Sequence, residues 1–101
     1  MEKATEHADS ASSLLHALDV AARALQQVGP HRVELVTVAR GWLLMQPEHL
    51  PDGETLAQEL RLPLSLDHRM ITPSYTVWSG DREGLDLQVR AELRRPAGVL
   101  L

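Results

Sequence analysis

The residues from Leu85 to Arg94 alternate apolar and polar side chains without a break. Leucine, valine and alanine occupy the odd-numbered positions, and charged or amide side chains occupy the even-numbered ones. Because successive side chains of a β-strand point to opposite sides of the sheet, this period of two predicts a strand with one buried face and one solvated face. The pattern describes architecture rather than chemistry.

A helix is predicted from about residue 10 to residue 28. Asp9 or Ser10 can cap its N-terminus, since either side chain can accept a hydrogen bond from a free backbone N–H of the first turn. At the other end, Gly29 supplies a left-handed residue and Pro30 prevents continuation. The apolar stripe that we expect to face the core consists of Leu14, Leu18, Ala21, Leu25 and Val28, widened by Leu15 and Ala22.

Two short apolar strands joined by a turn are predicted next, over residues 32–38 and 42–45. The first is rich in valine, and the second is the run Trp42–Met45. Ala39–Arg40–Gly41 lies between them, and Gly41 suits the positive φ that tight hairpin turns require. The two segments therefore read as a β-hairpin.

A short second helix follows a loop bracketed by Pro47 and Pro51. Asp52 can cap this helix, and Pro63 ends it. Its apolar stripe consists of Leu56, Ala57 and Leu60.

The last third of the chain reads as a linker followed by two strands. Residues 64–67 lead into a third extended segment, about His68–Ser79. Pro73 cannot donate to a strand ladder, so it indicates an edge strand or a bulge there. The polar loop Ser79–Gly84 then returns the chain to the alternating strand.

These elements predict one small α+β domain in the order α-β-β-α-β-β, with a mostly antiparallel four-stranded sheet and two helices. We expect residues 1–9 to form a flexible N-terminal tail, residues 10–95 the domain, and residues 96–101 a C-terminal tail. The connection between the two strand pairs is long enough for a crossover, so the second pair can run parallel or antiparallel to the first.

The first hairpin is predicted to be apolar on both faces if Arg40–Gly41 forms a two-residue turn. One face then holds Val36, Val38, Leu43 and Met45, and the other holds Val33, Leu35, Thr37, Ala39, Trp42 and Leu44. Since contiguous apolar patches rarely stay exposed on monomers, both faces need cover. Either the two helices cover one face each, or they share a face and a second subunit covers the other. The second arrangement predicts a homodimer, with an interface assigned to Val36, Val38, Trp42, Leu43 and Met45.

Composition excludes several classes of function. The chain has no cysteine, so disulfides, thiolate catalysis and cysteine-ligated zinc are ruled out. A net charge of −4 without a basic stripe disfavours nucleic-acid binding. No apolar run is long enough to cross a bilayer, and residues 1–10 do not resemble a secretory signal, so we expect a cytoplasmic protein with no membrane partner.

No motif in the sequence assigns a catalytic, cofactor-binding or metal-binding residue. The histidines at positions 7, 16, 31, 49 and 68 show no metal-ligand spacing and read as surface residues. Asp67–His68–Arg69 is the densest polar cluster, but neighbouring residues of an extended segment point to opposite faces, so Asp67 should not orient His68 as a base. The loop Ser79–Gly84 lacks the spacing and the following helix of a phosphate-binding loop.

The function that these patterns favour is a small non-enzymatic protein-binding module, a homodimer with an adaptor, chaperone-like or inhibitor (immunity) role. The alternative is a small-molecule-binding protein or small enzyme. Its pocket would lie between helix and sheet or at a dimer seam, and would use His68, Arg69 or Tyr75.

Overall fold

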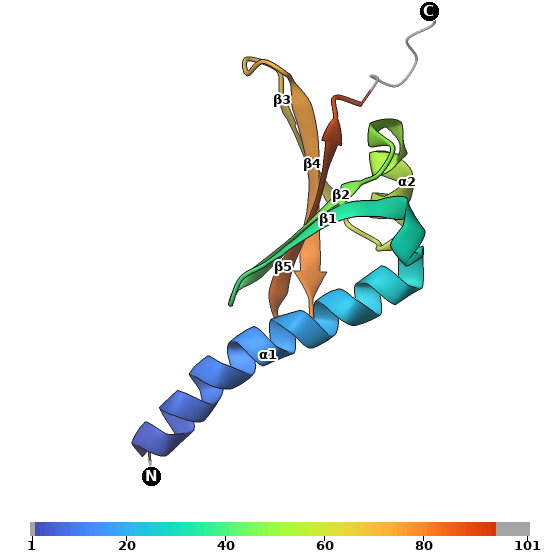
Figure 1. Cartoon of the computed structure of the whole chain (residues 1–101). Coiled ribbons are helices and arrows are strands. Elements are labelled where there is room, and N and C mark those ends of the chain that lie inside the picture. The colour runs from blue at the N-terminus through green and yellow to red at the C-terminus, as the bar shows by residue number, and fades with distance from the viewer. Residues whose placement is uncertain (1, 95–101) are drawn as a thin grey trace, which may run out of the picture.

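A computed structural model describes residues 2–94, with side chains from residue 13 onward. Residues 2–94 form two α-helices, two short 3-10 helices and five strands (Figure 1). In order these are α1 (Glu2–Val28), η1 (Pro30–Arg32), β1 (Val33–Val38), β2 (Trp42–Pro47), η2 (Leu50–Asp52), α2 (Gly53–Glu59), β3 (Leu64–His68), β4 (Tyr75–Arg82) and β5 (Leu85–Glu92).

The five strands form one mixed sheet in the order β1-β2-β5-β4-β3. Neighbouring strands are antiparallel except β2 and β5, which run parallel with Trp42 beside Asp86. The α+β class with two helices is confirmed, and the expected four-stranded, mostly antiparallel sheet is corrected to five strands with one parallel pair. The alternating strand of the sequence is β5, and it lies at the centre of the sheet.

The additional strand is β3, which the sequence reading treated as a linker. Leu64 and Leu66 alternate with Ser65 and Asp67 there, and the segment pairs with β4 from Leu64 opposite Ser79 to His68 opposite Tyr75. The predicted segment His68–Ser79 is divided because Pro73 lies in the turn between β3 and β4, after a cis Thr72–Pro73 peptide bond.

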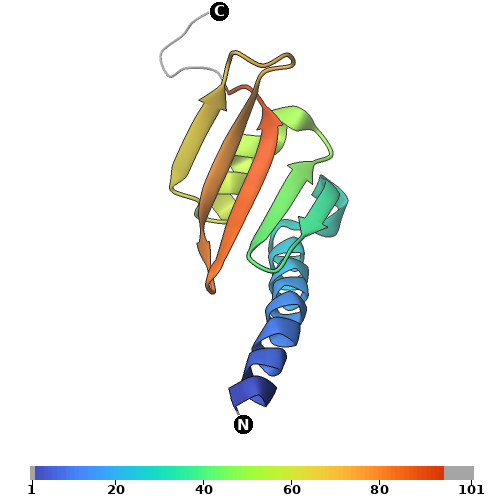
Figure 2. The ribbon, with the colours of Figure 1, turned by 90° about the vertical axis from the view of Figure 1, so that its left-hand side faces the viewer.

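Both helices pack on the same side of the sheet. In Figure 2 the sheet faces the viewer and α2 lies behind it. Helix α1 extends downward from the part of the sheet that contains β1 and β2. Residues from both helices and from the inward side of β2, β4 and β5 form a single apolar core. Gly53 begins α2 directly against the sheet, since a Cβ built there would collide with Ala91 and lie 2.9 Å from the Trp78 ring. Asp52 precedes this helix as expected but makes no side-chain capping hydrogen bond.

Helix α1 begins at Glu2, earlier than the predicted cap at Asp9 or Ser10, and ends as predicted before Gly29, whose φ is +100°. The predicted C-terminal tail, residues 96–101, lies outside the described residues.

The buried face of α1 differs from the predicted leucine stripe. From residue 13 onward, the side chains that it buries are Ala17, Val20, Ala21, Ala24 and Val28. Leu14, Leu15 and Leu18 are exposed instead, and Leu25 is half-buried. The small alanine side chains allow the helix axis to approach the sheet closely, which leucines in their place would prevent. We call Leu14, Leu15 and Leu18 the leucine ridge.

Hydrogen bonds fix α1 to two hairpin turns at one end of the sheet. Ser13 Oγ donates to the carbonyl of Arg40 at 2.9 Å, and His16 Nε2 lies 2.9 Å from the carbonyl of Glu83. Arg23 also binds both carboxylate oxygens of Glu83, at 2.6 and 3.0 Å. The helix therefore spans from the β1–β2 turn to the β4–β5 turn.

The first hairpin has the predicted register. Val38 pairs with Leu43 and Val36 with Met45, and the amide of Ala39 donates to the carbonyl of Trp42 at 3.0 Å. The two-residue turn and the division of side chains between the two faces are thus confirmed over Val36–Met45. A bulge shifts the pairing between Val33 and Leu35, and the expected positive φ at Gly41 is not found.

Candidate functional site

In the described part of the chain, no helix or other segment covers the face of the sheet opposite α1 and α2 (Figures 1 and 2). We call it the open face. Strand pairing and side-chain alternation place on it Leu35 and Thr37 of β1, Trp42, Leu44 and Gln46 of β2, Asp86, Gln88, Arg90 and Glu92 of β5, Tyr75, Val77, Ser79 and Asp81 of β4, and Leu64, Leu66 and His68 of β3.

Large apolar side chains lie on this face on both sides of a polar central strand. On β1 and β2, Leu35 and Trp42 are exposed, and Trp42 keeps 40% of its surface accessible. On β3, Leu64 and Leu66 keep 64% and 62%. Large apolar side chains gathered on one surface are uncommon on monomeric soluble proteins, so the open face is the candidate site in the described part of the chain.

A shallow groove of about 350 Å³ crosses the open face from β2 to β3. Its lining includes Leu44, Leu66, His68, Tyr75, Val77 and Arg90. The rings of His68 and Tyr75 stack with their centroids 4.5 Å apart, and the Arg90 guanidinium lies 3.9 Å from the Tyr75 ring centroid. The cation–π contact holds the Arg90 side chain against the face instead of leaving it to extend into solvent.

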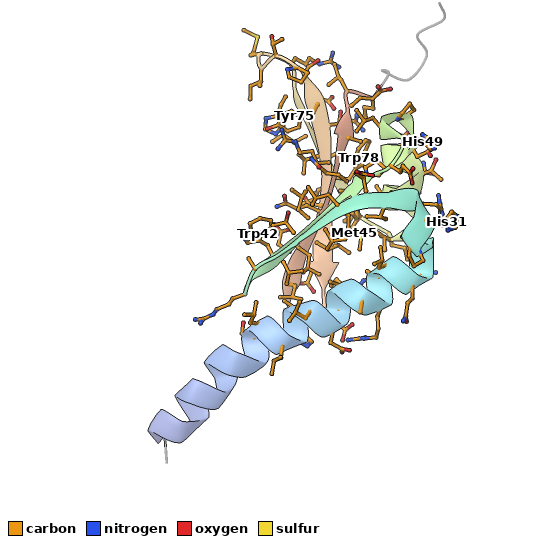
Figure 3. All side chains as sticks on the ribbon, viewed as in Figure 1. His31, Trp42, Met45, His49, Tyr75 and Trp78 are labelled. Atoms are coloured by element: carbon orange, nitrogen blue, oxygen red, sulfur yellow. The ribbon has the colours of Figure 1, made fainter. Side chains whose placement is uncertain are left out.

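The structure separates the five predicted interface residues into two layers. Trp42 lies on the open face, whereas Met45 points to the opposite side of the sheet (Figure 3). Leu43 and Met45 are fully buried beneath the helices, and Val36 and Val38 are half-buried on that same side. Only Trp42 of the predicted set is therefore available on the open face.

The sequence reading missed the contribution of β3 and β4 to this face. Leu64 and Leu66 gave a signal, because they alternate with polar residues over the length of a strand. Tyr75, Val77 and Arg90 gave none that could place them together, since only the pairing of β3, β4 and β5 brings them to one groove.

Asp67 and His68 lie on opposite faces of β3, as predicted. The Asp67 carboxylate accepts hydrogen bonds from Thr76 Oγ1 at 2.8 Å and from Arg94 Nε at 3.2 Å. The Thr76 hydrogen bond, supported by Arg94, lowers the pKa of Asp67 below its ordinary value, against a smaller raising effect of desolvation. Arg69 approaches the same carboxylate at 3.6 Å. This cluster ties the end of β5 to β3 and does not orient His68 for catalysis.

Three further features of the described residues bear on the site. No three histidine, aspartate or glutamate side chains gather there as ligands of a metal ion. A cavity of about 240 Å³ between η2, α2 and the end of β5 is lined by Leu50, Pro51, Glu54, Trp78, Glu92, Leu93 and Arg94. Neither helix between residues 2 and 94 has the length and hydrophobicity to cross a membrane.

Comparison with known proteins gives no relative: no family model, no curated protein and no solved structure matches the chain significantly.

Proposed function

We propose that this chain is a small, non-enzymatic protein-binding module that acts as a homodimer through the open face. Its role is that of an adaptor, a chaperone-like protein or an inhibitor, and we place it in the cytoplasm. The observation that carries the proposal is the combination of two helices on one side of the sheet with large exposed apolar side chains on the other.

The size of the open face is compatible with a stable contact. Strands lie about 4.8 Å apart and rise about 3.3 Å per residue, so strands of five to eight residues give a face of about 500 Å². Two such faces would bury about 1,000 Å² together, which reaches the lower limit of specific interfaces. The contact would also remove Trp42, Leu64 and Leu66 from water.

The leucine ridge supports a further protein partner. Leu14, Leu15 and Leu18 lie on α1 outside the core, and the N-terminal half of α1 extends beyond the sheet (Figure 1). A 27-residue helix is about 40 Å long, so the ridge offers a surface away from the groove. Amphipathic helical surfaces of this kind commonly dock against another protein.

Size-exclusion chromatography with light scattering tests the homodimer. The expected mass is twice that of the 11.2 kDa chain. Leu66→Glu, on the open face, should shift the protein to a monomer because it places a charge in the contact. Met70→Glu is the matched control, since Met70 is 98% exposed in the β3–β4 turn and its substitution should leave the mass unchanged. A wild-type chain that stays monomeric at millimolar concentration would refute the homodimer.

A second candidate function, binding of a small aromatic anion, is favoured by the stacked His68, Tyr75 and Arg90 side chains in the groove. An anion could pair with Arg90 while its ring packs against Leu66 or Val77. Titration of the ¹⁵N-labelled chain with phenyl phosphate tests it. Saturable shifts confined to Tyr75, Arg90 and their neighbours would support this function, and unchanged spectra at millimolar phenyl phosphate would refute it for this class of ligand.

A further inference from the structure

The open face of β5 carries Asp86 and Arg90, two opposite charges placed symmetrically about Gln88, and Glu92 at the end of the strand. Asp86 and Arg90 lie on the same face, each two residues from Gln88 and therefore about 7 Å from it along the strand. Because β5 is the central strand, these charges lie in the middle of any contact that covers the open face.

We infer that the second copy of this chain docks on the open face about a two-fold axis. This axis runs parallel to the sheet and across the strands, and it passes over β5 at Gln88. This inference rests on the proposed homodimer and specifies its geometry. With this axis the two β5 strands face each other in opposite directions. Asp86 of each copy then faces Arg90 of the other, and Gln88 faces its own counterpart.

A two-fold axis that runs along the strands at β5 is the alternative with aligned sheets. It would place Arg90 opposite Arg90 and Asp86 opposite Asp86 in the centre of the contact. Like charges that face each other in an interface are strongly unfavourable, and a buried charge without a partner is costly. The charges of Asp86 and Arg90 therefore favour the axis across the strands over the axis along them.

The apolar residues of the neighbouring strands agree with this axis. Leu44 lies level with Gln88, and so does Leu64, through its pairing with Ser79. An axis at that level brings Leu44 and Leu64 each toward the same residue of the second copy. Leu44 and Leu64 thus each meet their own counterpart, whereas Val77 faces Asp81 of the second copy, since these two residues lie level with Arg90 and Asp86.

Both charged side chains are already held in place within one chain. Arg90 is held over the Tyr75 ring, and Asp86 accepts a 2.6 Å hydrogen bond from Gln88 Nε2. Ordering these side chains before contact lowers the entropic cost of forming the interface.

Charge-reversal variants test the geometry. Asp86→Arg and Arg90→Asp should each raise the dimer dissociation constant by about tenfold or more, because each places like charges opposite one another. An equimolar mixture of the two variants should form a heterodimer, since every Arg then faces an Asp. The double variant, Asp86→Arg with Arg90→Asp, should dimerise by itself. Analytical ultracentrifugation measures the constants, and native mass spectrometry separates the heterodimer by its mass.

The outcomes separate this inference from the proposed function. A monomeric wild-type chain refutes both. A wild-type dimer that neither single variant weakens, or that the mixture and the double variant fail to restore, refutes the two-fold axis at Gln88 and leaves the homodimer standing. Both substituted positions are exposed, and the pair Asp86→Lys and Arg90→Glu repeats the test should either first variant fail to fold, as judged by circular dichroism.

Discussion

Thr76 of β4 is completely buried, and its hydroxyl joins β3 to the chain that leaves β5: it donates to the Asp67 carboxylate at 2.8 Å and accepts from the Arg94 backbone amide at 3.0 Å. The Asp67 side chain is 19% exposed. Ionised Asp67 thus accepts a hydrogen bond from a fully desolvated donor, and its protonation weakens the whole cluster.

Acid should destabilise the fold through Asp67. Its pKa is lowered in the folded chain, so the folded state holds this proton less readily than the unfolded state. The stabilisation is complete above the ordinary aspartate pKa and is lost as the pH falls below about 4. By urea unfolding, the difference in free energy of unfolding between wild type and Asp67→Asn should be larger at pH 7 than at pH 3. Asp81→Asn, at an exposed position of β4, is the control, and a gap that is independent of pH would contradict this role of Asp67.

Gly53→Ala should destabilise the fold by about 1–3 kcal/mol, because the new methyl group would collide with Ala91 and the Trp78 ring where α2 meets the sheet. Gly41→Ala is the matched control, since nothing lies within 4 Å of a Cβ there and its φ is not positive. Thermal unfolding of both variants measures the difference. Equal melting temperatures would show that α2 does not pack this closely.

The orientation of α1 predicts a small effect on stability at Leu15 and a large one at Ala17. Leu15 is 65% exposed, so Leu15→Ala should change the free energy of unfolding by no more than about 0.5 kcal/mol. Ala17 is fully buried, and Ala17→Leu should cost about 1–3 kcal/mol through overpacking against the sheet. Chemical denaturation of both variants tests this. A large loss for Leu15→Ala with little change for Ala17→Leu would show that the leucines face the core.

Local sequence patterns predicted the elements that depend on residues close together in the chain. The alternation of Leu85–Arg94 predicted β5, and Gly29 marked the end of α1. The register of the first hairpin followed from its two-residue turn. β3 was missed because it has only five residues, which lie between Pro63 and a turn that contains Pro73. A period of two is difficult to recognise over so short a segment.

The site could not be predicted in the same way, for two physical reasons. Helix α1 carries both an alanine face and a leucine face, and only the closeness of the sheet decides which one is buried. The open face depends on strand order: Trp42, Leu66 and Arg90 come from three separate strands, and the parallel pairing of β2 with β5 is what places them on one surface.

That pairing also has a consequence for how the domain is built during synthesis. Within the sheet the β1–β2 and β3–β4 hairpins are joined only through β5, which is the last strand of the described residues. A nascent chain that has reached Arg82 therefore holds two isolated hairpins, each of which is marginal in water. The ribosome must extend the chain through Glu92 before the strand that unites them exists, so we expect cooperative folding to wait for that moment.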